Sequence, residues 1–126
     1  MKLLMTAIAT TMALSSTVYA ESANDEITRK IRFDLNQLDE FGLYGPEDGR
    51  RSLCNEFCLP NDLLGIDSVQ AIDPTLIIYL QSAGRVGCDD QEVLAIGETH
   101  QPHYRDVLIN LASLDTIDRI EQFWGE

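Results

Sequence analysis

The sequence predicts a small α+β domain, and three observations lead to this fold class. Short segments of alternating or β-branched apolar residues are interleaved with segments whose apolar residues recur every three or four positions. After residue 51 the predicted order of these segments is strand, helix, strand, strand, helix, strand. The chain has 126 residues, which suffice for one ordinary domain and are too few for two.

Residues 1–20 have the pattern of a signal peptide. A single cation, Lys2, precedes an apolar stretch, and a polar Ser-Ser-Thr run follows it. Val18 and Ala20 occupy the −3 and −1 positions of a cleavage site between Ala20 and Glu21. Threonines and serines interrupt the apolar stretch, which therefore falls short of the roughly 20 residues of a membrane span. We expect an exported protein, secreted or periplasmic, with no stable membrane anchor.

Residues 21–51 are expected to form an N-terminal helix followed by a Gly/Pro loop. Apolar residues at helical spacing predict the helix over residues 22–41: Ile27, Ile31, Leu35 and Leu38. Gly42 supplies a C-terminal stop, and the dipeptides Gly-Pro and Asp-Gly within residues 42–51 are typical of turns. The helix is a candidate cover for a sheet face that the two later helices leave open.

Residues 52–126 are expected to form the small α+β domain itself. Residues 52–59 alternate in polarity, which predicts a strand. Its two faces carry Leu53, Phe57 and Leu59, and Cys54, Glu56 and Cys58, respectively. A short helix follows, because Asn61 or Asp62 is a suitable N-cap and apolar residues recur every three positions until Pro74 ends the helix.

The rest of the domain is expected to contain two further strands, a second helix and a last strand. β-branched and aromatic residues in 75–80 predict a second strand. We expect a third strand over residues 92–97, which a polar loop over residues 82–91 joins to the second as a hairpin. Residues 102–114 place their apolar side chains on one helical face. For residues 116–124 we favour a fourth strand over a longer helix, because Asp-Thr is a weak helix-forming pair and the following Ile, Phe and Trp suit a strand.

The resulting order, β-α-β-β-α-β, predicts a ferredoxin-like sandwich when the crossovers are right-handed. Two helices then cover one face of an antiparallel sheet, and the N-terminal helix is an addition to this arrangement. The fold hosts enzymes, metal carriers, propeptides and binding modules, so the fold alone does not indicate a function.

Three cysteines in an exported protein predict at most one intramolecular disulfide. Cys54 and Cys58 lie four residues apart in a strand, about 13 Å from each other, which is too far for a bond. Cys58 is at the end of the first predicted strand, and Cys88 is in the hairpin loop at the same edge of the sheet. We therefore expect the disulfide Cys58–Cys88, with Cys54 left as a free thiol.

The chain is strongly acidic, with nine Lys and Arg against 21 Asp and Glu and a net charge of −12. Such a chain repels phosphate groups, so we expect no nucleic-acid partner. The acidic runs at residues 24–26, 47–48 and 89–92 lack the oxygen spacing of an EF-hand loop. We interpret them as solvated charges.

His100 and His103 are the candidate metal ligands. Three residues apart at a helix start, they could share a face and bind Zn²⁺ or Cu²⁺. A third ligand would come from Cys54, Asp73 or Glu98. The sequence contains no HExxH motif, nucleophile elbow or Gly-rich phosphate loop, so we expect neither a catalytic site nor a cofactor.

The favoured functional hypothesis is an exported, acidic, non-catalytic module that binds a protein partner. One alternative is a zinc or copper carrier or sensor that uses His100, His103 and the free cysteine. Another is an inhibitor or propeptide-like domain for an exported hydrolase, and a small hydrolase is the least favoured. The metal content of the purified protein separates the first two hypotheses.

Residues 75–80, from Thr75 to Leu80, are the candidate partner surface. In the ferredoxin-like strand order this strand lies at a sheet edge, and its successive apolar residues carry no charge that would discourage pairing. A partner strand, or a second copy of the chain in a homodimer, would complete the sheet there. The alternative is that the N-terminal helix covers these side chains.

We expect the exported protein to begin at Glu21, because the order of charge, apolar stretch and small residues directs cleavage after Ala20. Intact-mass measurement on protein from the exported fraction checks this expectation. A mature chain that retains residues 1–20 would contradict the prediction of export and remove the basis for oxidised cysteines.

Overall fold

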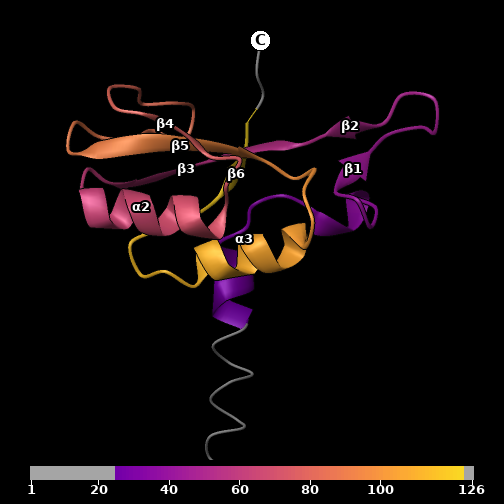
Figure 1. The fold of residues 1–126 in the computed structure, drawn as a ribbon, viewed down its shortest axis with the longest axis horizontal. Coiled ribbons are helices and arrows are strands. Elements are labelled where there is room, and N and C mark those ends of the chain that lie inside the picture. The colour runs from indigo at the N-terminus through magenta and orange to yellow at the C-terminus, as the bar shows by residue number, and fades with distance from the viewer. Residues whose placement is uncertain (1–24, 124–126) are drawn as a thin grey trace, which may run out of the picture.

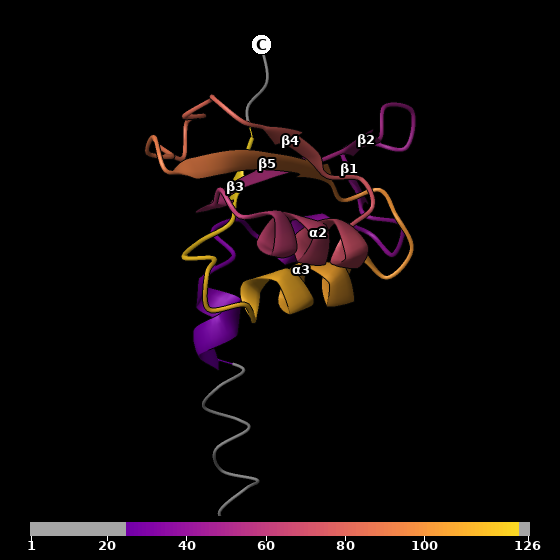
Figure 2. The same cartoon turned by 60° about the vertical axis from the view of Figure 1, so that its left-hand side comes forward.

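The computed structural model describes residues 25–123, which form a mixed α+β structure (Figure 1). The predicted signal peptide and its cleavage site between Ala20 and Glu21 lie outside the described residues, as does the end of the predicted strand over residues 116–124. Figure 1 shows a sheet above two helices, and the same layers are visible after the turn in Figure 2.

Strands β3 (Cys54–Pro60) and β5 (Glu92–Glu98) form the centre of a four-stranded sheet. They pair antiparallel along their whole length, from Cys54 opposite Glu98 to Pro60 opposite Glu92. Strand β4 (Ile77–Tyr79) pairs antiparallel with β5, and β6 (Glu121–Gln122) pairs antiparallel with β3. The strand order is therefore β4-β5-β3-β6, with β4 at one edge.

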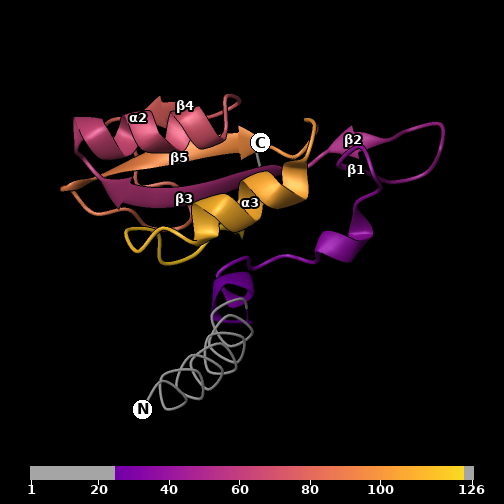
Figure 3. The same ribbon diagram turned by 60° about the horizontal axis from the view of Figure 1, so that its bottom comes forward.

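Helices α2 (Leu63–Ile72) and α3 (Tyr104–Ala112) cover one face of this sheet and lie along its strands (Figure 3). Asp62 is the N-cap of α2, and its side chain accepts the backbone N–H of Gly65 at 3.1 Å. Helix α3 begins after His103, whose φ of 57° is left-handed, and not at the predicted residue 102. The core between helices and sheet includes Phe57, Leu59, Val69, Val93, Leu108 and Leu111.

The opposite face of the sheet is covered by the connection between β4 and β5, residues 80–91 (Figures 1 and 2). Val86 and Cys88 of this connection form a second apolar cluster with Leu94 of β5. The backbone N–H of Val86 donates to the buried carboxylate of Glu56 at 2.7 Å. A loop therefore supplies the cover that the two helices do not.

The predicted helix over residues 22–41 is wrong beyond its first part. Residues 25–29 are helical, but Ile31 then forms a parallel bridge with Ile120. Between residues 30 and 41 the structure has one short helical element, the 3-10 helix η1 (Leu35–Gln37).

Backbone hydrogen bonds to the end of the chain explain this difference. Arg32 N–H donates to the Ile120 carbonyl at 2.8 Å, and Ile120 N–H donates to the Lys30 carbonyl at 2.7 Å. These bonds satisfy the backbone groups that a continued helix would have paired internally. Ile31 and Leu38 are buried in the main core, so their spacing reflects contacts with that core. The expectation that this segment covers the other face of the sheet is therefore wrong.

The predicted loop over residues 42–51 contains a small hairpin of β1 (Leu43–Tyr44) and β2 (Arg51–Ser52). Its turn holds the two dipeptides that predicted a loop, and Gly45 has a positive φ of 102°. Two-residue strands are too short to show a periodic pattern, so their pairing was not predicted.

The predicted disulfide is confirmed. Cys58 and Cys88 are bonded, with their Cα atoms 5.4 Å apart, and Cys54 is a free thiol. Cys58 lies opposite Leu94 in the register of β3 and β5. The bond therefore ties the covering connection to the central strand of the sheet.

We expect the double variant Cys58→Ala, Cys88→Ala to lower the free energy of unfolding by about 3–4 kcal/mol, because the bond closes a loop of 30 residues in the unfolded chain. Denaturant titration monitored by circular dichroism measures the change. The matched control is Cys54→Ala, which leaves the bond intact and is expected to have the smaller effect. Equal losses in the two variants would contradict a structural role for the bond.

Candidate interaction surface

His100 and His103 lie in the connection between β5 and α3. The Nδ1 atom of His100 donates to the Phe41 carbonyl at 2.9 Å, whereas His103 is the N-cap residue of α3 and makes no capping bond through its side chain. Within residues 25–123 no three His, Cys, Asp or Glu side chains are grouped so that they could hold a metal ion. Metal binding by the two histidines stays a prediction without an identified third ligand.

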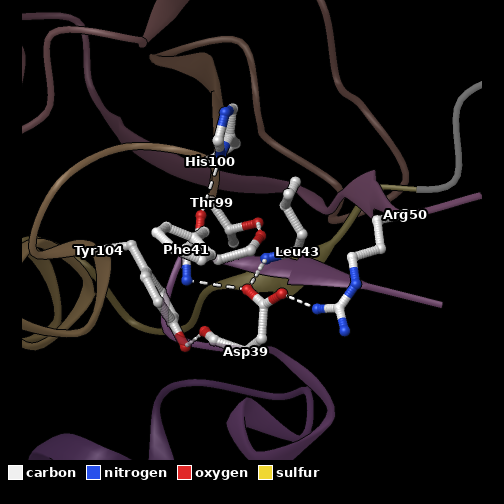
Figure 4. A network of polar contacts seen from close by, with 8 residues as sticks. Asp39, Phe41, Leu43, Arg50, Thr99, His100 and Tyr104 are labelled. Carbon is white, nitrogen blue, oxygen red and sulfur yellow. Dashed lines mark hydrogen bonds and ion pairs between the residues drawn. The ribbon is translucent and has the colours of Figure 1, made fainter. Parts of the chain in front are cut away.

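His100 belongs instead to a network that attaches residues 39–51 to the main sheet (Figure 4). The hydroxyl of buried Thr99 donates to the Gly42 carbonyl at 2.6 Å and accepts the backbone N–H of Leu53 at 2.9 Å. The hydroxyl of Tyr104 donates to the Asp39 carbonyl at 2.7 Å. Three parts of the chain that lie far apart in the sequence, just before β1, just before β3 and after β5, are thereby held together.

Gly42 is required at this junction for two reasons. Its φ of +75° is strained for a residue with a side chain, and a Cβ atom there would lie 2.0 Å from the Thr99 carbonyl oxygen. Any larger residue would therefore push the N-terminal segment away from the sheet.

Asp39 organises the same segment through its carboxylate. Its Oδ1 atom accepts the backbone N–H groups of Leu43 at 3.0 Å and Phe41 at 2.8 Å, and its Oδ2 atom forms an ion pair with Arg50. The Leu43 N–H contributes most to lowering the pKa of Asp39, Phe41 and Arg50 lower it further, and desolvation opposes them in part.

The free thiol of Cys54 lies half-buried on β3, with Glu98 as its neighbour on β5. Burial raises the pKa of this thiol, and the negative charge of Glu98 raises it further. A thiol with a raised pKa is mostly protonated at neutral pH and is a weak nucleophile. These surroundings are those of a structural cysteine.

The exposed part of the predicted partner strand is a separate surface, which we call the β4 edge surface: Ile77, Tyr79 and Leu80. Their exposed fractions are 58%, 42% and 62%, whereas Leu76 next to them is 6% exposed. Ile77 and Tyr79 lie opposite Ile96 and Leu94 of β5, on the face covered further along by residues 80–91. Ile78 points the other way and packs against the main core. The strand therefore divides its apolar side chains between the core and the solvent.

A turn after α2 fixes the position of β4. The carboxylate of Asp73 accepts the backbone N–H of Thr75 at 2.9 Å and its hydroxyl at 2.7 Å. The Thr75 hydroxyl also accepts the backbone N–H of Glu98 at 3.0 Å, which anchors the turn to β5. Gly97 allows this approach, because a Cβ atom there would lie 2.8 Å from an oxygen of Asp73.

Two hollows adjoin the β4 edge surface. A shallow one is lined by Ile78, Tyr79, Leu80, Gln81 and Ser82. The second shares Leu80, Gln81 and Ser82 with the first and is also lined by Ala83, Cys88 and three acidic residues. We call these three residues the acidic triad: Asp89, Asp90 and Glu92. The sequence showed the acidic run, but only the folded connection brings it next to the exposed strand.

In comparisons with known proteins, no protein-family model, no curated protein and no solved structure matches this sequence. None of the helices in residues 25–123 is long and apolar enough to span a membrane.

We expect Asp39 to make stability depend on acidic pH. Since its pKa is lowered by folding, the carboxylate stabilises the folded state above the ordinary Asp pKa of about 4, and this contribution is lost as the pH falls through the lowered value. Urea unfolding of the wild type and of Asp39→Asn at a series of pH values measures the difference, which should be largest near neutral pH and shrink in acid. The control is Asp48→Asn, in the exposed turn between β1 and β2. A difference that does not change with pH would contradict the assignment.

Proposed function

We propose that this protein is an exported, acidic, non-catalytic module that binds a protein partner by addition of a strand to β4. The observation that carries the proposal is the β4 edge surface, where apolar side chains and an unpaired strand edge are exposed together. In strand addition, backbone hydrogen bonds supply affinity and alternate side chains supply specificity.

The lack of a charge, a proline or a bulge in β4 supports this proposal. Natural edge strands are usually guarded by Lys, by Pro or by a bulge, because an unguarded edge pairs with other chains. Strand β4 and Leu80 after it contain none of these, and β4 pairs with β5 without interruption. The short length of β4, three residues, limits unwanted pairing, but its exposed apolar side chains stay available to a partner strand.

We further propose that the domain has the ferredoxin-like arrangement. The order β3-α2-β4-β5-α3-β6, the sheet order β4-β5-β3-β6 and the antiparallel pairing of all neighbours support it. In this arrangement the second strand of the motif lies at a sheet edge, which is the position of β4.

A secreted or periplasmic location belongs to the same proposal. The sequence pattern of residues 1–20 supports export, and the disulfide Cys58–Cys88 is compatible with an oxidising compartment.

A site-specific photo-crosslinker tests the proposed partner binding. It replaces Leu80 in the β4 edge surface, and in a matched protein it replaces Leu64, which is 78% exposed on α2. We expect irradiation of the exporting cells to give a discrete adduct with another protein from position 80 and none from position 64. The same adducts at both positions, or none at position 80, would refute the proposal.

Leu80→Lys should abolish the interaction while Leu64→Lys preserves it, because only the first places a charge on the apolar edge. Capture of the crosslinked protein by each purified variant measures the effect, and circular dichroism verifies that both variants are folded. Retained capture by folded Leu80→Lys would show that the edge is not the binding surface.

A further inference from the structure

We propose that the segment added to β4 is an extended apolar strand flanked by lysine or arginine, whose cations enter the hollow of the acidic triad. This inference rests on the proposed function and names the chemistry of the partner. It follows from the position of the triad, from its lack of cationic partners and from the charge of the chain.

The acidic triad lies at the Leu80 end of the edge. The apolar hollow along β4 and the acidic hollow share Leu80, Gln81 and Ser82, so a chain that follows the first continues into the second. Glu98, which is also exposed, lies near the opposite end, where its backbone bonds to Thr75. Acidic residues therefore lie near both ends of β4.

The loop itself sets the positions of the triad. Glu92 accepts the backbone N–H of Asp89 at 3.0 Å, and Asp89 accepts the N–H of Gln91 at 2.8 Å. Asp90 is exposed between them. Across residues 25–123 ion pairs form at Asp39 with Arg50 and at Glu121 with Arg119, and none involves the triad. Arg85, in the same connection, forms no ion pair with these carboxylates, and Arg119, which lines a hollow together with Glu92, pairs with Glu121.

Strand β4 is too short to form a stable interface by strand pairing alone. β4 has three residues, and an interface that is stable on its own buries about 1,000 Å² or more. Contacts in the adjoining hollow extend the interface, and opposite charges there accelerate association.

A second copy of the chain fits this surface poorly. Antiparallel pairing of two β4 strands would bring the acidic triad of one copy towards Glu98 of the other, and parallel pairing would bring the two triads together. Each copy also has a net charge of −12. Like charges oppose both dimers, whereas a cationic strand is attracted.

Three synthetic peptides test the proposal. They share one alternating Thr-Val stretch and are flanked at both ends by Lys, Gln or Glu. We expect the Lys-flanked peptide to shift the amide NMR signals of Ile77–Tyr79 and to bind about tenfold more tightly than the Glu-flanked one, with the difference shrinking at high salt. Equal binding of the three peptides, or binding by none, would overturn the inference.

Two pairs of variants separate this inference from the proposed function. Asp90→Lys should weaken binding of the Lys-flanked peptide about fivefold, whereas Asp67→Lys, the same change at an exposed position of α2, should not. Leu80→Lys should abolish binding of every peptide, whereas Leu64→Lys should not. If Leu80→Lys abolishes binding and Asp90→Lys has no effect, the strand-addition function stands and the charge preference is wrong. If binding survives Leu80→Lys but is lost in Asp90→Lys, the peptide binds by charge alone and both proposals fall.

Light scattering on the purified protein tests whether a second copy of the chain pairs with β4. We expect a monomer at low and at physiological salt. A dimer that Leu80→Lys dissociates and Leu64→Lys does not would overturn the inference and identify a second copy as the chain that covers the edge.

Discussion

The fold depends on one constraint: the central strands carry apolar side chains on both faces, so the sheet has to be covered twice. Phe57 and Val93 face the helices, whereas Leu94 and Cys58 face the other way. Helices α2 and α3 cover the first face, and residues 80–91 cover the second. Without that second cover, Leu94 and its neighbours would be left in water at a cost of about 25 cal/mol per Å² of apolar surface.

A covering loop needs fixed attachments, because it lacks the internal hydrogen bonds of a helix. Here the attachments are the disulfide at Cys88 and polar bonds around Val86. Glu56 accepts the Val86 N–H, and Arg119 donates to the Val86 carbonyl. The backbone of one loop residue is thus held from both sides.

The buried side chain of Glu56 lowers the stability of the folded state. The side chain is fully buried, and its Oε2 atom has no hydrogen-bond partner among the described residues. A buried polar atom without a partner destabilises the folded state by about 1–3 kcal/mol. The disulfide offsets such a cost because it removes freedom from the unfolded chain.

The path of the same loop also shapes the candidate interaction surface. The connection leaves β4 at Leu80 and turns onto the sheet, so it protects Leu94 but leaves the outer edge of β4 open. On its return it places the acidic triad beside the start of the loop. One loop therefore creates both the exposed apolar edge and the charge next to it.

Elements with local signals could be predicted from the amino-acid sequence. Alternation predicted β3, an N-cap and apolar spacing predicted α2, and a single apolar face predicted α3. Strand geometry excluded a bond between Cys54 and Cys58. Tertiary structure decided whatever depends on contacts between distant residues. Ile31 pairs with Ile120 and not within a helix, β1 and β2 pair although each has two residues, and a loop covers the second face of the sheet. Periodicity reports which side chains are buried, but it does not identify the segment that buries them, because that segment lies elsewhere in the chain.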